Sequence, residues 1–155
     1  MEEQVTERMI IRGTPMECFT VLTDFERYPD WAADIKSVTV DSRDEQGRAV
    51  EVTFRAAAFG RSTSYTLLYD YAGSPFALSW TQTDGDITRR LDGSYELSES
   101  GEGGTEILYR LVVDLKVPLP GFVKRRAEGR IMGTALRELK AFVEGPGAQQ
   151  PASDS

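Results

Sequence analysis

The chain has 155 residues, the length of one ordinary domain, and a formal net charge of -7. This acidic balance argues against a nucleic-acid-binding protein, because neutralising phosphates requires a basic face. The chain has no histidine, which excludes histidine-based acid–base catalysis and histidine metal sites, and we expect neither a metal nor a cofactor.

The single cysteine, Cys18, has no internal disulfide partner and no histidine with which to form a catalytic pair. We interpret it as a small core residue. The first residues are charged and contain no apolar signal segment. No apolar run approaches the roughly 20 residues that a membrane-spanning helix needs. These features predict a cytoplasmic protein without a transmembrane segment.

The chain begins with a predicted strand and a capped helix. Residues 4–12 are rich in β-forming side chains and alternate roughly between apolar and polar. Thr14 and Glu17 then have the spacing of a capping box, and Pro15 between them suits the first turn of a helix. We therefore expect a short helix directly after the first strand.

A second short helix is expected just before the chain becomes strand-like. Residues 23–26 have the form of an N-cap followed by a helical turn. Tyr28 and Pro29 are expected to stop this turn, because the residue before a proline is disfavoured in a helix. Trp31 lies just beyond this break.

From residue 35 to residue 115 apolar side chains recur at every second position, which is typical of strands with one apolar face. Turn-forming residues interrupt the pattern, and Asp84-Gly85 is a strong signal for a hairpin turn. The pattern predicts an antiparallel meander whose inward faces carry Val52, Phe54, Tyr65, Leu67, Tyr69, Leu78, Trp80, Arg89, Leu91, Tyr95, Leu97, Ile107, Tyr109, Leu111 and Val113.

Residues 120–145 are predicted to form one long helix, with Pro120 in its first turn and Gly145 at its end. Its apolar side chains are spaced by three and four residues, so they form a broad stripe that can cover the apolar face of the sheet. We expect one α+β domain over residues 1–145 and a disordered tail over residues 146–155. The stripe consists of Val123, Ala127, Ile131, Met132, Ala135, Leu136, Leu139, Phe142 and Val143.

This order of elements resembles the START-like superfamily, and within it most resembles the polyketide cyclase/dehydrase-type family. Three segments carry the resemblance: TPMECFTVLTDFERYPDW (residues 14–31), LDGSYELSE (91–99) and VPLPGFVKRRAEGRIMGTALRELKAFVE (117–144). It covers nearly the whole chain apart from the tail. The resemblance implies a helix-grip fold, in which an antiparallel sheet wraps around the long helix and encloses a cavity for an apolar or amphipathic small molecule. The family includes cyclases, aromatases, and lipid and quinone carriers.

Inward aromatic side chains are the strongest candidates for contact with such a molecule. As a set they favour a cavity, although each one taken alone is explained equally well as ordinary core. The candidate ligand-binding residues are Trp31, Phe54, Tyr65, Leu67, Trp80, Arg89, Leu91, Tyr95, Ile107, Tyr109, Ala127, Ile131 and Ala135.

Polar candidates are fewer. Arg89 shares the parity of inward side chains, so it could hold a ligand anion, or it could be solvated or paired with Asp84 or Asp86. Thr134 and Glu138 lie four residues apart on one helical face and reach either the cavity or solvent.

Lys124, Arg125, Arg126 and Arg130 form a basic cluster at the start of the long helix. They are either a solvated helix face or a site that attracts an anionic ligand or a membrane surface. We expect at most a weak membrane contact, through Lys124, Arg125 and Arg126.

Three functions therefore remain. The leading hypothesis is binding, and in some cases transport, of a hydrophobic small molecule such as a lipid, quinone or polyketide. The alternative is a polyketide cyclase or aromatase, with Arg89, Arg130, Tyr65 and Tyr109 as candidate catalytic residues. The third is a module that binds a protein or membrane. The sequence does not decide whether there is turnover, or between monomer and dimer.

Overall fold

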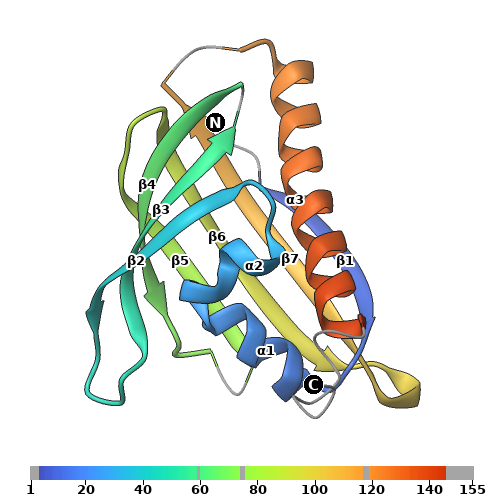
Figure 1. The fold of residues 1–155 in the computed structure, drawn as a ribbon. Helices are drawn as coiled ribbons and strands as arrows, with labels where there is room; N and C mark the ends of the chain where they lie inside the picture. Colours follow the sequence, from blue (N-terminus) through green and yellow to red (C-terminus); the bar gives the residue numbers. More distant parts are fainter. Residues whose placement is uncertain (1–3, 59, 74–75, 117–118, 146–155) are drawn as a thin grey trace.

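The computed structural model describes residues 4–58, 60–73, 76–116 and 119–145. The predicted tail at residues 146–155 lies outside this part. The described elements follow the predicted order of strand, short helices, meander and long helix (Figure 1). They are β1 (Val5–Arg12), α1 (Pro15–Thr23), the 3₁₀ helix η1 (Phe25–Arg27), α2 (Tyr28–Trp31), β2 (Ile35–Arg43), β3 (Ala49–Ala58), β4 (Arg61–Asp70), β5 (Ala77–Gly85), β6 (Thr88–Glu99), the 3₁₀ helix η2 (Gly101–Gly103), β7 (Gly104–Leu115) and α3 (Gly121–Glu144).

The strands form one antiparallel seven-stranded sheet in the order β1-β7-β6-β5-β4-β3-β2. Each of the strands β2 to β6 pairs with the next strand along the chain, which is the predicted meander, and β1 joins the sheet beside β7. The sheet curves around α3, which packs against β1 and β7, while α1 and α2 lie across the lower front in the view of Figure 1. The predicted α+β helix-grip fold is confirmed.

The capping box at the start of α1 is confirmed. The Thr14 hydroxyl accepts from the Glu17 N–H at 3.1 Å, and the Glu17 carboxylate accepts from the Thr14 N–H at 2.9 Å. Pro15 occupies the first helical turn, where its missing N–H is no loss. Cys18, one turn later, is completely buried, and burial raises the pKa of its thiol. Its predicted role as a small core residue is confirmed.

The expected end of the second helix is wrong. Tyr28 and Pro29 do not stop the chain's helical path: η1 leads directly into α2, and Pro29 sits in the first turn of α2. A proline is tolerated there because the first N–H groups of a helix have no partner within the helix. The helical segment therefore extends to Trp31, which brings that ring close to α3.

The hairpin predicted from Asp84-Gly85 is present between β5 and β6, but its turn lies later than predicted. Both residues still belong to β5 and pair with β4, so the chain turns only after Gly85. The cause is the next residue, Asp86, whose carboxylate accepts from the Thr63 hydroxyl and, at 3.0 Å, from the Ser64 N–H. These bonds hold the end of β5 against β4.

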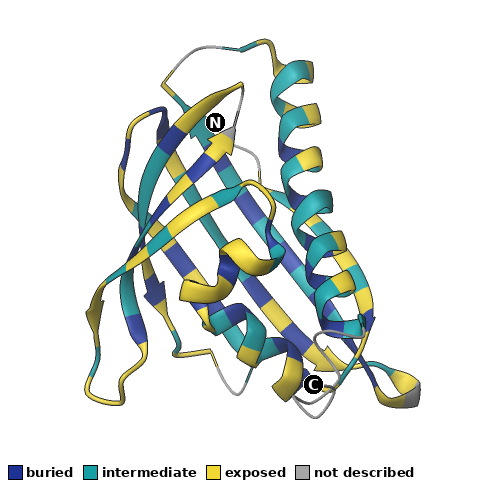
Figure 2. Ribbon diagram, in the orientation of Figure 1, coloured by how far each residue is buried: buried dark blue, intermediate teal, exposed yellow. Residues whose placement is uncertain are grey.

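The long helix is confirmed, with Pro120 and Gly145 as its flanking residues. One side of it faces the sheet and is closed from solvent. Together with the inward faces of the strands this side forms the main core, seen as the dark blue bands on the concave face of the sheet in Figure 2. The helix side chains in this core are Met132, Leu136, Leu139 and Val143.

Candidate functional site

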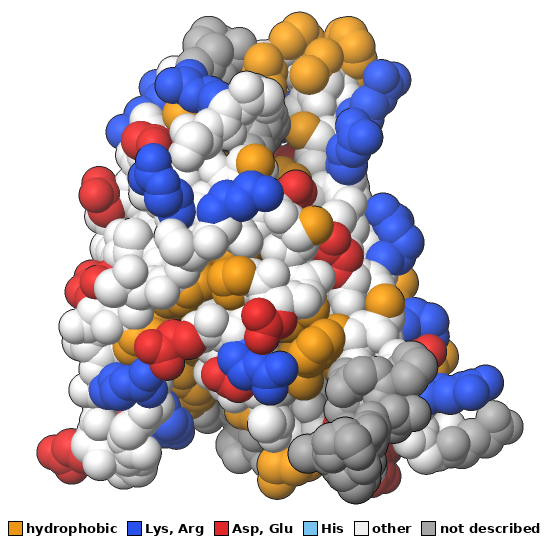
Figure 3. Space-filling model, viewed as in Figure 1, with side chains coloured by type: hydrophobic (Ala, Val, Ile, Leu, Met, Phe, Trp, Pro, Cys, Tyr) orange, Lys and Arg blue, Asp and Glu red, His pale blue; other side chains and the backbone are white. Residues whose placement is uncertain are grey.

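A cavity of about 910 Å³ lies between the concave face of the sheet and α3. Its wall includes residues of α2, the start of β2, strands β3 to β7 and the first three-quarters of α3. This volume falls within the roughly 300–1,000 Å³ of typical small-molecule pockets. In the space-filling view, apolar side chains show between charged ones in the region in front of α3 (Figure 3).

Most of the predicted ligand-binding residues lie on this wall. The sheet contributes those that share the inward parity, and α3 contributes those spaced by four residues. The period-two and period-four patterns therefore located the interior correctly for Trp31, Phe54, Tyr65, Leu67, Trp80, Leu91, Tyr95, Tyr109, Ala127, Ile131 and Ala135. Of the predicted catalytic candidates, Tyr65, Tyr109 and Arg130 also line it.

Two predicted site residues do not line the cavity. The register of β6 is irregular between Thr88 and Arg90, so Arg89 points outward, with 60% of its side chain exposed and its guanidinium 3.9 Å from the Asp114 carboxylate. The inward placement of Arg89 is wrong, and buried Thr88 lines the wall instead. Ile107 does point inward, but it is completely buried in the closed core away from the cavity.

The floor of the cavity is a continuous layer of aromatic rings. The ring centroids of Trp80 and Tyr95 are 5.1 Å apart, those of Tyr95 and Tyr109 4.5 Å, and those of Tyr69 and Trp80 5.8 Å. Desolvation raises the pKa of Tyr65 and of these three tyrosines above the ordinary range. All four phenols are therefore protonated at neutral pH, so they can donate a hydrogen bond but do not act as bases.

Two indole N–H groups on this wall are buried without an acceptor. Among the described residues no hydrogen-bond partner faces Nε1 of Trp31 or Nε1 of Trp80. Native proteins satisfy most buried donors, because an unpaired one loses its hydrogen bonds to water without replacement. The cavity wall therefore holds two donors that the protein itself leaves unsatisfied.

The connection between α2 and β2 and the turns at the strand ends complete the wall. Tyr28 from α2 is fixed there by a hydrogen bond from its hydroxyl to the Leu22 carbonyl at 2.6 Å. Connections have no period, so the sequence pattern carried no signal for the wall residues that lie in them. The inward spacing did include Ala56, Leu111 and Val113 on strands and Val123 on α3. The residues not assigned to the site from sequence are Tyr28, Ala32, Asp34, Ile35, Ala56, Ala57, Gly60, Arg61, Thr63, Ile87, Thr88, Leu111, Val113 and Val123.

The wall residues on α3 form two parallel rows, each with steps of four residues, which a helix stacks along one face. One row is apolar and partly buried, and consists of Val123, Ala127, Ile131 and Ala135. The other row is polar and consists of Arg126, Arg130, Thr134 and Glu138, with both arginines exposed. Thr134 and Glu138 thus reach the cavity, the first of the two placements considered for them.

The basic cluster at the start of α3 does not act as one patch. Lys124 pairs with the carboxylate of Glu128 at 2.9 Å, and Glu128 is only 2% exposed. Arg125 is exposed away from the cavity wall, whereas Arg126 lines it. A contact of Lys124, Arg125 and Arg126 with a membrane surface stays a prediction. No described helix is long and apolar enough to cross a membrane.

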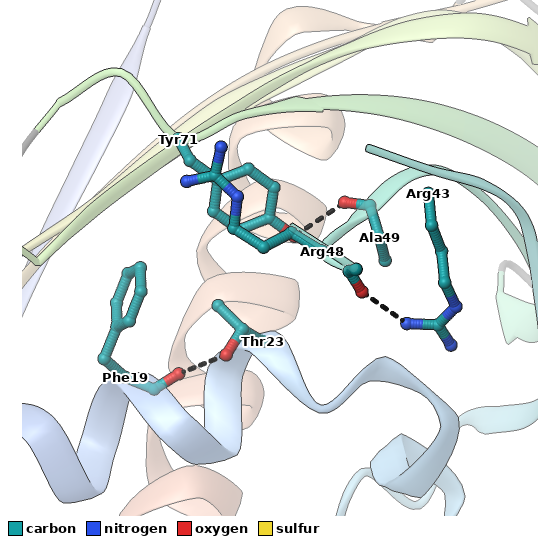
Figure 4. Close-up of a pocket in the computed structure, with 7 residues that line it drawn as sticks. Phe19, Thr23, Arg43, Arg48, Ala49 and Tyr71 are labelled. Carbon is teal, nitrogen blue, oxygen red and sulfur yellow. Dashed lines mark hydrogen bonds between the residues drawn. The ribbon is translucent and has the colours of Figure 1, made fainter. Parts of the chain in front are cut away.

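A second hollow, of about 280 Å³, lies between α1 and the β2–β3 hairpin. Figure 4 shows that its polar groups are occupied: Arg43 donates to the Gly47 carbonyl at 3.0 Å, and the Tyr71 hydroxyl donates to the Ala49 carbonyl at 2.6 Å. Arg43 and Arg48 each also pair with a carboxylate. These contacts fix the hairpin and leave no group free for a ligand. No three His, Cys, Asp or Glu side chains of the described residues gather as a metal site requires.

Comparison with known proteins gives one family and many similar folds. A family model described as "Polyketide cyclase / dehydrase and lipid transport" matches residues 11–140. No curated protein matches the chain. The similar structures share so little sequence that they speak for the fold alone.

Three of these structures illustrate the range. A START superfamily protein from Mycobacterium smegmatis is 20% identical, with a TM-score of 0.87 over 93% of this chain and 98% of the other. The Zhui aromatase/cyclase from Streptomyces sp. R1128 is 11% identical, with a TM-score of 0.83 over 97% and 99% of the two chains. The major latex-like protein 151 from Panax ginseng is 12% identical, with a TM-score of 0.69 over 90% and 96%.

Proposed function

The chain belongs to the polyketide cyclase / dehydrase and lipid transport family, and we propose that it binds a hydrophobic or aromatic small molecule in the cavity under α3. The observation that carries the proposal is a cavity of about 910 Å³ in a chain of 155 residues. Protein interiors normally pack to the density of organic crystals, so a hollow of this size lined by apolar side chains is unusual. A bound apolar molecule would remove that apolar wall from water.

The character of the wall supports an aromatic or polycyclic ligand. Trp80, Tyr95 and Tyr109 present a layer of ring faces and edges, against which a planar molecule would gain stacking beyond simple burial of area. The phenols on the wall are protonated, so they can donate a hydrogen bond to a ligand oxygen. The similar fold of an aromatase/cyclase agrees with such a ligand.

The direct test fills part of the cavity with a larger side chain on α3. Ala135 lies on the wall and Ala141 on the exposed side of the same helix, so Ala135→Trp and Ala141→Trp form a matched pair. A neutral fluorescent probe, N-phenylnaphthylamine, should bind the wild type and Ala141→Trp equally, and Ala135→Trp at least about tenfold more weakly. Equal binding by all three proteins would show that the probe sits elsewhere. Native mass spectrometry of protein from its own host, before and after organic extraction, would then give the mass of the natural ligand.

A second candidate function is a polyketide cyclase or aromatase. What favours it is that Tyr65, Tyr109 and Arg130 line the same cavity, so a phenol and a guanidinium could act on one substrate. In this role Tyr65 would donate a proton and Arg130 would stabilise enolate charge. Tyr65→Phe should then abolish turnover of a poly-β-ketone substrate while N-phenylnaphthylamine still binds. Unchanged turnover in Tyr65→Phe and in Arg130→Gln would remove this candidate.

A further inference from the structure

The polar row of α3 places two guanidinium groups on the cavity wall without a counter-ion. Arg126 and Arg130 are four residues apart, so their side chains leave the helix as neighbours on one face. Among the described residues no carboxylate lies within ion-pair distance of either group. Like charges at this spacing repel each other, so the pair costs stability in the unliganded protein.

Arginines elsewhere in the described chain are placed differently. Most of them lie against a carboxylate, as expected in a protein whose net charge is -7. Arg126 and Arg130 are among the arginines with no carboxylate in ion-pair distance in the described part of the chain, and they are neighbours on the wall of the large cavity. The paired arginines are Arg8, Arg27, Arg43, Arg48, Arg89, Arg90 and Arg110.

The other charged groups on the cavity wall are already engaged or lie on other elements. Both carboxylate oxygens of Glu138 face the Ala33 N–H at 3.3 Å. Asp34 lies in the connection between α2 and β2, and its field acts on Tyr65. Arg61, at the start of β4, also lines the wall, and its charge adds to the hydrogen bond from Thr63 in lowering the pKa of the Asp86 carboxyl. The two arginines of α3 are therefore the pair of neighbouring cations on one element that a ligand would meet.

We infer that the natural ligand is an amphipathic anion, with a carboxylate or similar group held by Arg126 and Arg130 and its apolar body against the aromatic floor. This inference rests on the proposed function, because it needs the cavity to bind an apolar body. The arrangement of α3 suits such a molecule: the apolar row that begins at Val123 runs beside the polar row, so both parts of the ligand would contact one helix. Guanidinium groups bind carboxylate and phosphate oxygens in pairs.

Two fluorescent probes that share a ring system separate the inference from the proposed function. N-Phenylnaphthylamine is neutral, and anilinonaphthalene sulfonate adds one anionic group to the same body. We expect Arg126→Gln/Arg130→Gln to weaken sulfonate binding roughly tenfold and to leave binding of the neutral probe unchanged. Arg125→Gln, which removes an exposed charge off the cavity wall, should change neither. Added salt should weaken only the sulfonate.

The outcomes are distinct. Failure of the neutral probe to bind would contradict the proposed function and the inference with it. Binding of the neutral probe together with equal sulfonate affinity in wild type and double variant would overturn the inference alone. Displacement of the sulfonate probe by millimolar acetate or phosphate, with no displacement of the neutral probe, would show a site for free anions and also overturn it. Because the double variant removes a like-charge repulsion, it should be at least as stable as the wild type, so loss of fold cannot mimic the expected result.

Discussion

Two rows of apolar side chains run along α3, and each row lies in a different environment. The row facing β1 and β7, which includes Leu136, is at most 4% exposed, whereas the row facing the cavity, which includes Ala135, stays partly exposed. Hydrophobic pattern alone does not distinguish the rows; side-chain size does. The core row is Met, Leu, Leu and Val, and the cavity row alternates larger residues with alanine. The small residues leave the space that α3 could otherwise have filled.

The largest expected effect on stability comes from truncating a side chain of the core row. Leu136→Ala removes a side chain that is 2% exposed and leaves a void that its packed neighbours cannot close. We expect a loss of about 3 kcal/mol in the free energy of unfolding, measured by urea denaturation. A loss under about 1 kcal/mol would mean that the core row is as loosely packed as the cavity row, and the contrast between them would disappear.

The next effect concerns the floor beneath the cavity. Trp80 lies directly over Gly93: a β-carbon added at Gly93 would lie 2.6 Å from Cζ2 of Trp80 and 2.6 Å from the Arg110 carbonyl oxygen. Gly93→Ala must therefore displace the indole or the strand, and we expect it to cost about 2 kcal/mol and to weaken probe binding.

The control for this change is Gly129→Ala in α3, where an added β-carbon meets nothing within 4 Å. Alanine favours a helix over glycine, so this variant should gain about 0.5–1 kcal/mol and bind the probe normally. If both variants behaved alike, Gly93 would not be what holds the floor ring in place.

Much of the fold could be predicted from the sequence because its elements are long and regular. The helix over residues 120–145, the capping box at Thr14 and the inward parity of the strands all follow from local chemistry and period. The errors arose where one residue breaks the period. The bulge beside Arg89 reverses its side-chain direction, and the hydrogen bonds of Asp86 prolong β5 beyond its turn signal. Neither effect leaves a mark in a pattern of apolar and polar residues.

The site was less predictable than the fold. Inward apolar and aromatic side chains are expected both in a pocket and in a closed core, and the sequence does not distinguish the two. Only the packing does: Trp80 and Tyr109 line the cavity, whereas Ile107 on the same sheet face does not. Connections added Asp34 and Arg61, which no period identifies. Whether a charge is paired also depends on its particular neighbours: within one turn of α3, Lys124 has the Glu128 carboxylate beside it, whereas Arg126 lines the cavity.

A smaller effect concerns the end of the core row. The Glu144 carboxylate accepts from the Arg12 N–H at 2.7 Å and pairs with Lys140 at 2.7 Å, which ties the last turn of α3 to β1. These contacts lower its pKa. A lowered pKa stabilises the folded state at neutral pH, and this contribution is lost as the pH falls below about 4 and through the folded-state pKa.

Glu144→Gln keeps an acceptor for Arg12 but removes the charge. Because the group is largely solvent-screened, we expect a loss of only about 0.5–1 kcal/mol at neutral pH, shrinking in acid. Urea denaturation at several pH values would measure it. A loss that did not change with pH would come from the hydrogen-bond geometry and not from the charge.

The smallest expected effect on stability comes from truncating a side chain of the cavity row. Ile131 has packed neighbours on one side and the cavity on the other, so Ile131→Ala enlarges an existing space and does not create a new one. Since its open side makes no contacts to lose, we expect the free energy of unfolding to change by less than about 1 kcal/mol.

Probe affinity should respond more to Ile131→Ala, because a ligand in the cavity would pack against this side chain. The comparison with Leu136→Ala then tests the two rows of α3. We expect Leu136→Ala in the core row to lower stability strongly and to change probe affinity little, and Ile131→Ala in the cavity row to do the reverse. Equal stability losses at Ile131 and Leu136 would mean that the cavity is closed in solution and that the helix has two core rows.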